Sequence, residues 1–239
     1  MPVNLDTPPP IPLRERLSHW LLPPRCLACG DPARQFDLCD ACIANLPDNR
    51  VACPCCALPL AASAPVCGEC LAATPPFSQG IAPWRYEGVI AHLLPRLKFQ
   101  RELAVAHVLG TLLAQRFDDW DGRDGITCVV PMPLHHSRLA QRGYNQALEL
   151  ARPLARARNL VIDTTLLARR RATAPQTDLD AAARRRNLRG AFSAAPANGH
   201  TVLLVDDVIT TGATVREAAH TLMRAGANEV RVLAISRAP

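Results

Sequence analysis

The apolar residues beyond residue 75 fall into runs that predict an alternation of strands and helices. Gly80–Tyr86 is strand-like, and Ile126–Val130 is a short apolar run that suits a buried parallel strand. Val202–Val205 predicts a further buried strand, and Asn228–Ile235 predicts the last one. Strands that alternate with helices in this way predict an α/β fold built on a parallel sheet.

Helical apolar spacing lies between these runs and ahead of them. Pro95 and Pro153 fall inside two of the predicted helices, where proline removes a backbone hydrogen bond. The last predicted helix is amphipathic and directly follows a loop rich in Thr and Gly. The predicted helices are Leu13–Leu22, Ile90–Leu97, Leu103–Phe117, Gln146–Ala157 and Thr214–Ala225.

Changes in amino-acid composition divide the chain into three regions. Residues 1–22 are a proline-rich lead with a short helix, residues 23–74 are rich in cysteine, and residues 75–239 form the α/β region. The apolar runs are far shorter than a membrane span, and no secretory signal precedes the cysteines. We therefore expect a cytoplasmic protein that is not inserted in a membrane.

Charge adds one constraint to this picture. The formal net charge is +6, and Lys98 is the only lysine among the basic residues. An arginine excess suits the binding of phosphates or of nucleic acid, although a general bias of surface charge explains it equally well. Aromatic residues make up only 4% of the chain, so the core must be mainly aliphatic.

Nine of the ten cysteines lie between Cys26 and Cys70, and eight of them form four Cys-x2-Cys pairs. Two such pairs supply the four thiolates of a closed, structural zinc site. The sequence leaves open how the pairs combine: in chain order, with the middle pairs sharing one metal, or with the pairs interleaved. It also leaves open whether one zinc ion binds or two. We expect Cys55 to be a bystander and Cys128 to be a core residue. The predicted zinc ligands are Cys26, Cys29, Cys39, Cys42, Cys53, Cys56, Cys67 and Cys70.

The segment after Val202–Val205 carries most of the functional information. Two adjacent carboxylates, Asp206 and Asp207, follow the buried strand, and a Thr- and Gly-rich loop then leads into a helix. Ligands bind at this edge of an open α/β sheet, and a helix N-terminus offers free N–H groups to a phosphate. A helix cap alone needs neither two acids nor this loop. The predicted phosphate-binding residues are Thr210, Thr211, Gly212, Ala213 and Thr214.

This string closely resembles the phosphoribosyl-pyrophosphate (PRPP) motif of type I phosphoribosyltransferases. The resemblance implies that Asp206 and Asp207 hold the ribose hydroxyls at the catalytic site, that 210–214 hold the 5′-phosphate, and that Mg²⁺ bridges the pyrophosphate. The segment 129–146 is similar to the pyrophosphate-loop region of the ComF competence family. We assign Arg138 and Arg142 from this segment to the PRPP site, because four-residue spacing on a helix gives them a common face.

Segments 170–179 and 186–192 and the paired zinc ribbons are also similar to the ComF family. The resemblance implies a Rossmann-like parallel sheet of the type I phosphoribosyltransferase kind, with a small N-terminal zinc-ribbon region. It further implies a PRPP-binding protein that serves DNA uptake in natural competence, with single-stranded DNA and proteins of the competence machinery as partners. One alternative is a phosphoribosyltransferase with an unidentified nitrogenous acceptor. Another is a non-catalytic zinc-ribbon protein that binds nucleic acid.

The arginine runs Arg169–Arg171 and Arg184–Arg186 have three interpretations. They close over PRPP, contact the phosphates of a nucleic acid, or form a solvated basic loop. The sequence does not decide among these.

Overall fold

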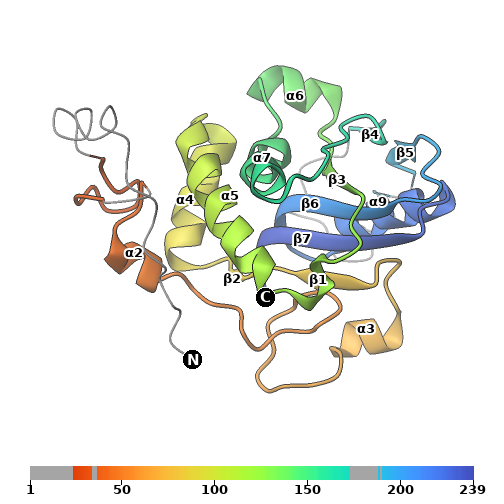
Figure 1. Cartoon of the computed structure of the whole chain (residues 1–239), viewed down its shortest axis with the longest axis horizontal. Helices are drawn as coiled ribbons and strands as arrows, with labels where there is room; N and C mark the ends of the chain where they lie inside the picture. Colours follow the sequence, from red (N-terminus) through yellow and green to blue (C-terminus); the bar gives the residue numbers. More distant parts are fainter. Residues whose placement is uncertain (1–23, 34–36, 173–187, 189) are drawn as a thin grey trace. The chain divides into compact units, whose positions relative to one another are not determined.

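A computed structural model describes residues 24–33, 37–172, 188 and 190–239 of the chain (Figure 1). The chain divides into two compact units, Met1–Ala44 and Asn45–Pro239. The division falls inside the predicted zinc-ribbon region, so that the second set of cysteines belongs to the larger unit. The helix predicted at Leu13–Leu22 lies outside the described residues.

In the smaller unit a tight turn carries the first cysteine pair. An antiparallel bridge between Arg25 and Pro32 closes the turn, and Gly30 within it has a φ of 82°, which glycine adopts without strain. The backbone N–H of Cys26 donates to the Asp31 carbonyl at 2.7 Å. The short helix α2 (Asp40–Ala44) then begins directly after Cys39.

The larger unit repeats this arrangement around the second set of cysteines. A bridge between Ala52 and Pro59 closes a turn, and α3 (Gly68–Ala72) begins directly after Cys67. Asn49 ties the turn to the rest of the unit, because its side-chain amide donates to the carbonyls of Ala57 at 2.9 Å and of Ala82 at 3.0 Å.

A parallel sheet of five strands forms the centre of the larger unit, as the sequence predicts (Figure 1). Its order is β1-β7-β6-β3, and β2 also pairs with β7. The predicted strand at Gly80–Tyr86 is in fact two short strands, β1 and β2, which pair with successive parts of β7. The bounds are β1 Gln79–Ile81, β2 Trp84–Arg85, β3 Cys128–Pro131, β6 Thr201–Ile209 and β7 Glu229–Arg237.

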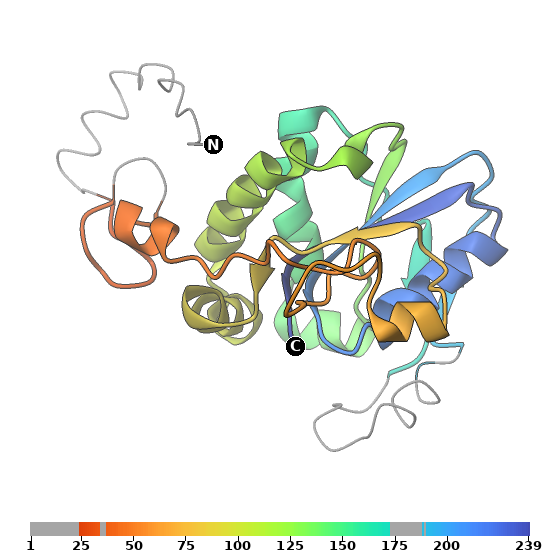
Figure 2. The same ribbon diagram turned by 90° about the horizontal axis from the view of Figure 1, so that it is seen from below.

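Alternate side chains of the strands pack on opposite faces of the sheet. On one face Val130, Val202, Leu204 and Val232 belong to a buried cluster that includes the second set of cysteines and α9 (Ala213–Arg224). On the other face lie α4 (Gly88–Phe99), α5 (Leu103–Asp118) and α7 (Gln146–Arg158), which Figure 2 shows on the side of the sheet away from α9. The second cysteine segment therefore covers the core together with α9.

Two glycines allow backbones to approach closely in this arrangement. A Cβ added at Gly80 in β1 would lie 2.8 Å from the Cys55 carbonyl oxygen, so the cysteine segment sits directly on the sheet edge. A Cβ at Gly110 in α5 would meet the Leu150 carbonyl oxygen at 2.6 Å and the ring of Pro153 at 2.9 Å. Pro153 is thus accommodated in α7 by contact with α5.

Besides α2 and α3, four further short elements were not among those predicted from the sequence. They are η1 (Asp121–Arg123), α6 (His136–Arg142), β4 (Leu167–Arg169) and β5 (Phe192–Ala194), of which β4 and β5 form an antiparallel pair. None of the helices in the described part of the chain combines the length and apolar character needed to cross a membrane.

Candidate functional site

Asp206 and Asp207 lie within β6 rather than after it, because the strand continues to Ile209. Their residues are only 8% and 5% exposed. The backbone N–H of Asp207 donates to Asp206 Oδ1 at 2.9 Å. Burial raises the pKa of Asp206 well above its usual value, and the neighbouring charge of Asp207 raises it further. The pair therefore retains a proton at a pH where exposed aspartates are both ionised.

Lys98 faces this pair, and the sequence analysis did not assign it to the site. It lies in the last turn of α4, and its Nζ is 2.5 Å from Asp207 Oδ2. Burial alone would lower the pKa of Lys98, but the charge and hydrogen bond of Asp207 outweigh burial and raise it. Its being the only lysine was the one signal in the sequence that set it apart.

The loop after β6 turns sharply into α9. Gly212 precedes the helix with a φ of 74°, and Thr211 Oγ1 accepts from the backbone N–H of Ala213 at 3.4 Å. The guanidinium of Arg237 fixes the start of the loop, because its Nη1 donates to the carbonyls of Ile209, at 3.1 Å, and Thr210. Because α9 begins directly after this loop, the free N–H groups of its first turn lie at the same edge of the sheet as the carboxylates.

A cavity of about 700 Å³ lies at this edge of the sheet. It is lined by the predicted residues Asp206, Asp207, Thr210, Thr214, Arg138 and Arg142, whereas Thr211, Gly212 and Ala213 complete the loop without lining it. Besides the two carboxylates its walls carry five cationic side chains, so the site suits a ligand with several negative charges. The cations are Lys98, Arg101, Arg138, Arg142 and Arg169.

The helix α6 brings Arg138 and Arg142 to the cavity from one face, as their spacing predicts. His135 caps this helix by accepting from the Ser137 backbone N–H at 3.4 Å. Arg142 donates to Gln146 Oε1 at 2.5 Å and lies over the ring of Phe99, 5.7 Å from its centroid. Phe99, which is 76% exposed, lines the cavity beside Arg142.

Arg169 enters the same cavity from the β4–β5 pair. Its guanidinium lies 5.5 Å from the centroid of the Phe192 ring. Burial lowers the pKa of Arg169, the nearby charge of Arg138 lowers it further, and Asp206 acts in the opposite direction. The structure thus takes Arg169 out of the basic loop with which the sequence grouped it, while Arg184–Arg186 lie outside the described residues.

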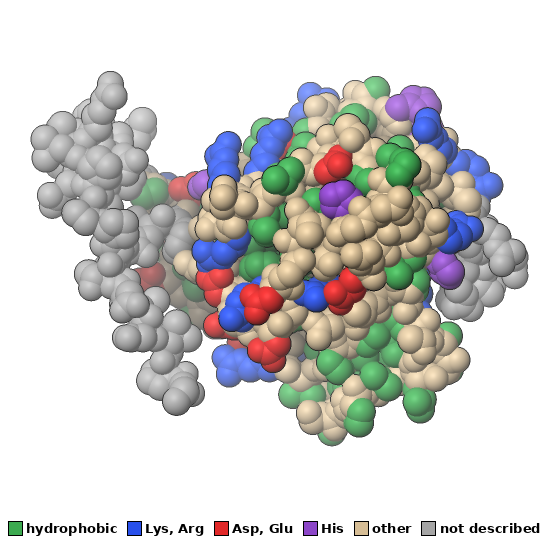
Figure 3. All heavy atoms as spheres, turned by 45° about the vertical axis from the view of Figure 1, so that its right-hand side comes forward, with side chains coloured by type: hydrophobic (Ala, Val, Ile, Leu, Met, Phe, Trp, Pro, Cys, Tyr) green, Lys and Arg blue, Asp and Glu red, His purple; other side chains and the backbone are tan. Residues whose placement is uncertain are grey.

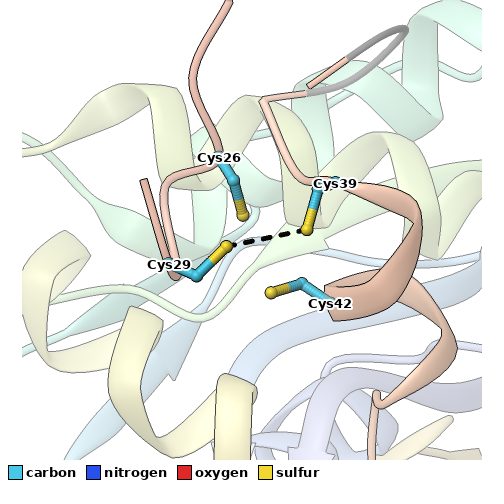
Figure 4. A group of neighbouring side chains, drawn as sticks. All are labelled: Cys26, Cys29, Cys39 and Cys42. Atoms are coloured by element: carbon cyan, nitrogen blue, oxygen red, sulfur yellow. Dashed lines mark hydrogen bonds between the residues drawn. The ribbon is translucent and has the colours of Figure 1, made fainter. Parts of the chain in front are cut away.

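The first cysteine set forms a compact tetrad in the smaller unit. Figure 4 shows the thiols of Cys26 and Cys29 from the turn, of Cys39 just before α2 and of Cys42 in α2 pointing to a common centre. The sulfurs of Cys29 and Cys39 are 3.6 Å apart. Burial raises the pKa of Cys26, but backbone N–H groups donated to its sulfur, foremost that of Cys39, lower it to about 6. Cys26 is therefore ready to supply a thiolate to a metal, whereas burial and the neighbouring thiols raise the pKa of Cys42.

The second tetrad lies in the larger unit and is fully buried. The sulfurs of Cys56 and Cys67 are 3.5 Å apart, and Cys53 Sγ accepts from the Cys67 backbone N–H at 3.2 Å. Burial raises the pKa of Cys53 while backbone N–H groups, led by that of Cys56, lower it to about 7. The ligands of both tetrads are paired in chain order, Cys55 belongs to neither, and Cys128 is buried in the core. Four convergent sulfurs in each place fit tetrahedral zinc.

Comparison with known proteins agrees with these two components. Residues 17–71 match the double zinc ribbon domain family, and residues 144–239 match the phosphoribosyl transferase domain family. The chain is thus a double zinc ribbon joined to an α/β domain of the phosphoribosyltransferase kind. It is 34% identical over 222 residues to DNA utilization protein YhgH of Escherichia coli strain K12, a match that covers 90% of this chain and 98% of that protein.

A second relative is competence protein F of Haemophilus influenzae, 34% identical over 179 residues, which are 72% of this chain and 78% of that protein. The chain belongs to the ComF family, which includes these relatives. Among solved structures, a glutamine PRPP amidotransferase from B. subtilis gives a TM-score of 0.37 at 24% identity, over 54% of this chain and 26% of that one.

Proposed function

We propose that the cavity binds PRPP together with Mg²⁺. The observation that carries this proposal is the convergence of a buried aspartate pair, a Thr-rich loop at a helix N-terminus and five cationic side chains on one cavity. Asp206 and Asp207 accept hydrogen bonds from the two ribose hydroxyls, and Thr210–Thr214 bind the 5′-phosphate. Arg138 and Arg142 contact the pyrophosphate, to which a bound Mg²⁺ would supply charge neutralisation.

Transfer of the ribosyl group is the reaction that this arrangement suits. Pyrophosphate leaves C1 of the ribose and a nitrogenous acceptor attacks the same carbon, so the protein has only to orient the two groups and stabilise an oxocarbenium-like state. No protein nucleophile is needed. The buried carboxylates lie where a developing positive charge on the ribose is stabilised, and the arginines stabilise the leaving pyrophosphate.

For the biological role, we propose that the protein serves DNA uptake in natural competence, in the cytoplasm. The names of the relatives, a DNA utilization protein and a competence protein, support this role. On the face shown in Figure 3, basic side chains of the described residues stand among acidic ones rather than in one continuous patch. Either separate arginine segments contact single-stranded DNA directly, or partner proteins of the competence machinery mediate the contact.

A calorimetric titration with PRPP·Mg²⁺ tests the site. The aspartate pair gives the diol a charged acceptor, and a hydrogen bond to a charged group contributes about 1.5–3 kcal/mol. We expect the double variant Asp206→Asn, Asp207→Asn to bind PRPP at least tenfold more weakly. Asp118 and Asp119 form an exposed adjacent pair at the end of α5, so changing both to Asn is a matched control that should leave the Kd unchanged.

An unchanged Kd in the Asp206, Asp207 variant would place PRPP elsewhere. Pyrophosphate release measured over a panel of bases and amines then separates an enzyme from a binding protein. Release that depends on one acceptor class identifies the acceptor, whereas tight binding without release with any of them limits the protein to a PRPP-binding role.

A further inference from the structure

Arg237 lies between the second cysteine tetrad and the loop that follows β6. It is the last residue of β7 and is only 3% exposed. Its Nη1 donates to the carbonyls of Ile209 and Thr210 on the loop side. Burial lowers the pKa of Arg237, while the Cys56 thiol, Glu69 and Cys67 act on the same guanidinium to raise it. The Arg237 side chain thus donates hydrogen bonds to the loop and interacts electrostatically with thiols of the tetrad.

Arg216 makes a second connection between the same two places. It lies in the first turn of α9, and its backbone N–H donates to the Gly212 carbonyl at 3.0 Å. Its Nη2 approaches Cys70 Sγ at 3.7 Å, and its Nη1 donates to the Ala73 carbonyl at 3.1 Å. The Arg237 side chain therefore holds the start of the loop, and the Arg216 side chain fastens α9, which begins at the end of the loop, to the second cysteine segment.

The charge of a zinc-loaded tetrad explains why two arginines are placed there. A zinc ion with four thiolates carries a net charge of about −2, and the second tetrad is buried on every ligand. A buried anion is costly unless opposite charge lies close to it. The two guanidinium groups supply that charge, and Arg237 Nε, which is buried without a hydrogen-bond partner among the described residues, suits a thiolate acceptor.

We propose that Arg216 and Arg237 are positioning residues that couple the second zinc site to the PRPP loop, so that zinc in this tetrad orders residues 209–213 and tightens PRPP binding. The part that concerns PRPP rests on the function proposed above. The part that concerns zinc and the loop stands on the contact of Arg216 with Cys70 and on the hydrogen bonds of Arg237 to the loop. The proposal does not extend to the first tetrad, which belongs to the smaller unit.

The test uses the full-length zinc-loaded protein and the variant Arg216→Gln, which keeps all eight cysteines. Loss of an outer contact to a metal ligand lowers metal affinity by about 10- to 100-fold. We expect chelator competition to show that weakening for one of the two zinc ions. We also expect faster hydrogen exchange in 209–213 and a PRPP Kd raised severalfold. Arg224→Gln, at an exposed position in the last turn of the same helix, is the matched control.

Arg237→Lys is the second variant, because it keeps the charge in the core while removing the guanidinium fork. This variant should weaken PRPP binding and lower zinc affinity less than Arg216→Gln does. Unchanged zinc affinity in Arg216→Gln would overturn the charge compensation, and zinc loss without faster exchange in 209–213 would overturn the coupling. If the wild type binds no PRPP, the proposed function fails, while the zinc and exchange measurements still decide this inference.

Discussion

Replacing Lys98 by Met tests the ion pair at the centre of the site. Lys98 Nζ lies 2.5 Å from Asp207 Oδ2, with side chains 24% and 6% exposed. Removal of one partner of a buried pair costs about 3–5 kcal/mol. Because a quarter of the Lys98 side chain reaches solvent, we expect a smaller loss in the free energy of unfolding, about 2–3 kcal/mol at pH 8.

The loss should depend on pH with a definite sign. Burial and the charge of Asp207 already raise the pKa of Asp206, and Lys98 opposes that rise. Without Lys98 the pKa of Asp206 rises further in the folded state. An acid with a folded pKa above its unfolded pKa destabilises the fold increasingly as the pH rises through that interval, because the unfolded chain releases its proton first. The destabilisation should therefore be smaller at pH 6 than at pH 8.

Urea unfolding of the zinc-loaded protein at pH 6 and pH 8 measures both quantities. The control is a double-mutant cycle with Asp207→Asn, in whose background Lys98→Met should cost less than about 1 kcal/mol. Equal destabilisation at the two pH values, or additive effects in the cycle, would show that Lys98 does not stabilise the site through its charge.

Three further predictions follow from the same contacts and from the sequence. Asp206→Asn should raise the free energy of unfolding at pH 8 while weakening PRPP binding, measured by urea titration and calorimetry. Metal analysis should find up to two zinc ions per chain, one for each tetrad, and Cys70→Ser should disrupt the fold far more than Cys55→Ser. Binding of a single-stranded oligonucleotide should weaken with salt, with a slope of about −0.7 per phosphate contact, and changing Arg184–Arg186 to Ala should flatten it.

The sequence predicted those features that depend on residues close together in the chain. Short spacing forces two thiols of a Cys-x2-Cys pair onto one turn, so the four pairs followed from the pattern. Their grouping in chain order into two tetrads, which the sequence left open, comes from the structure. The buried strands followed from apolar runs, and the loop 210–214 followed from its own composition. The four-residue spacing of Arg138 and Arg142 placed both on one face of α6.

What the sequence did not predict depends on contacts between distant segments. Lys98 meets Asp207 across more than a hundred residues, and nothing in the surroundings of Lys98 indicates that partner. The assignment of the second tetrad to the larger unit depends on Gly80, whose missing side chain lets the Cys55 backbone rest on β1. Arg237 is the last residue of β7 and was not recognised as a partner of the loop, because no local sequence pattern marks this arginine.

The energetics of Asp206 and Asp207 bear on the choice among the three functional hypotheses. Two adjacent carboxyls in the core raise each other's cost of ionisation, and an apolar pair of similar size would stabilise the strand more. In a protein that only binds nucleic acid through zinc ribbons, such a pair and the lysine opposite it would lower stability and contribute nothing to function. Asp207 Oδ2 has no hydrogen-bond donor among the described residues beyond its ion pair with Lys98. A ribose diol would give the carboxylates the donors that they lack. The loss of stability caused by the buried carboxyl pair is explained if a ligand completes the site. This favours PRPP binding over a relict fold.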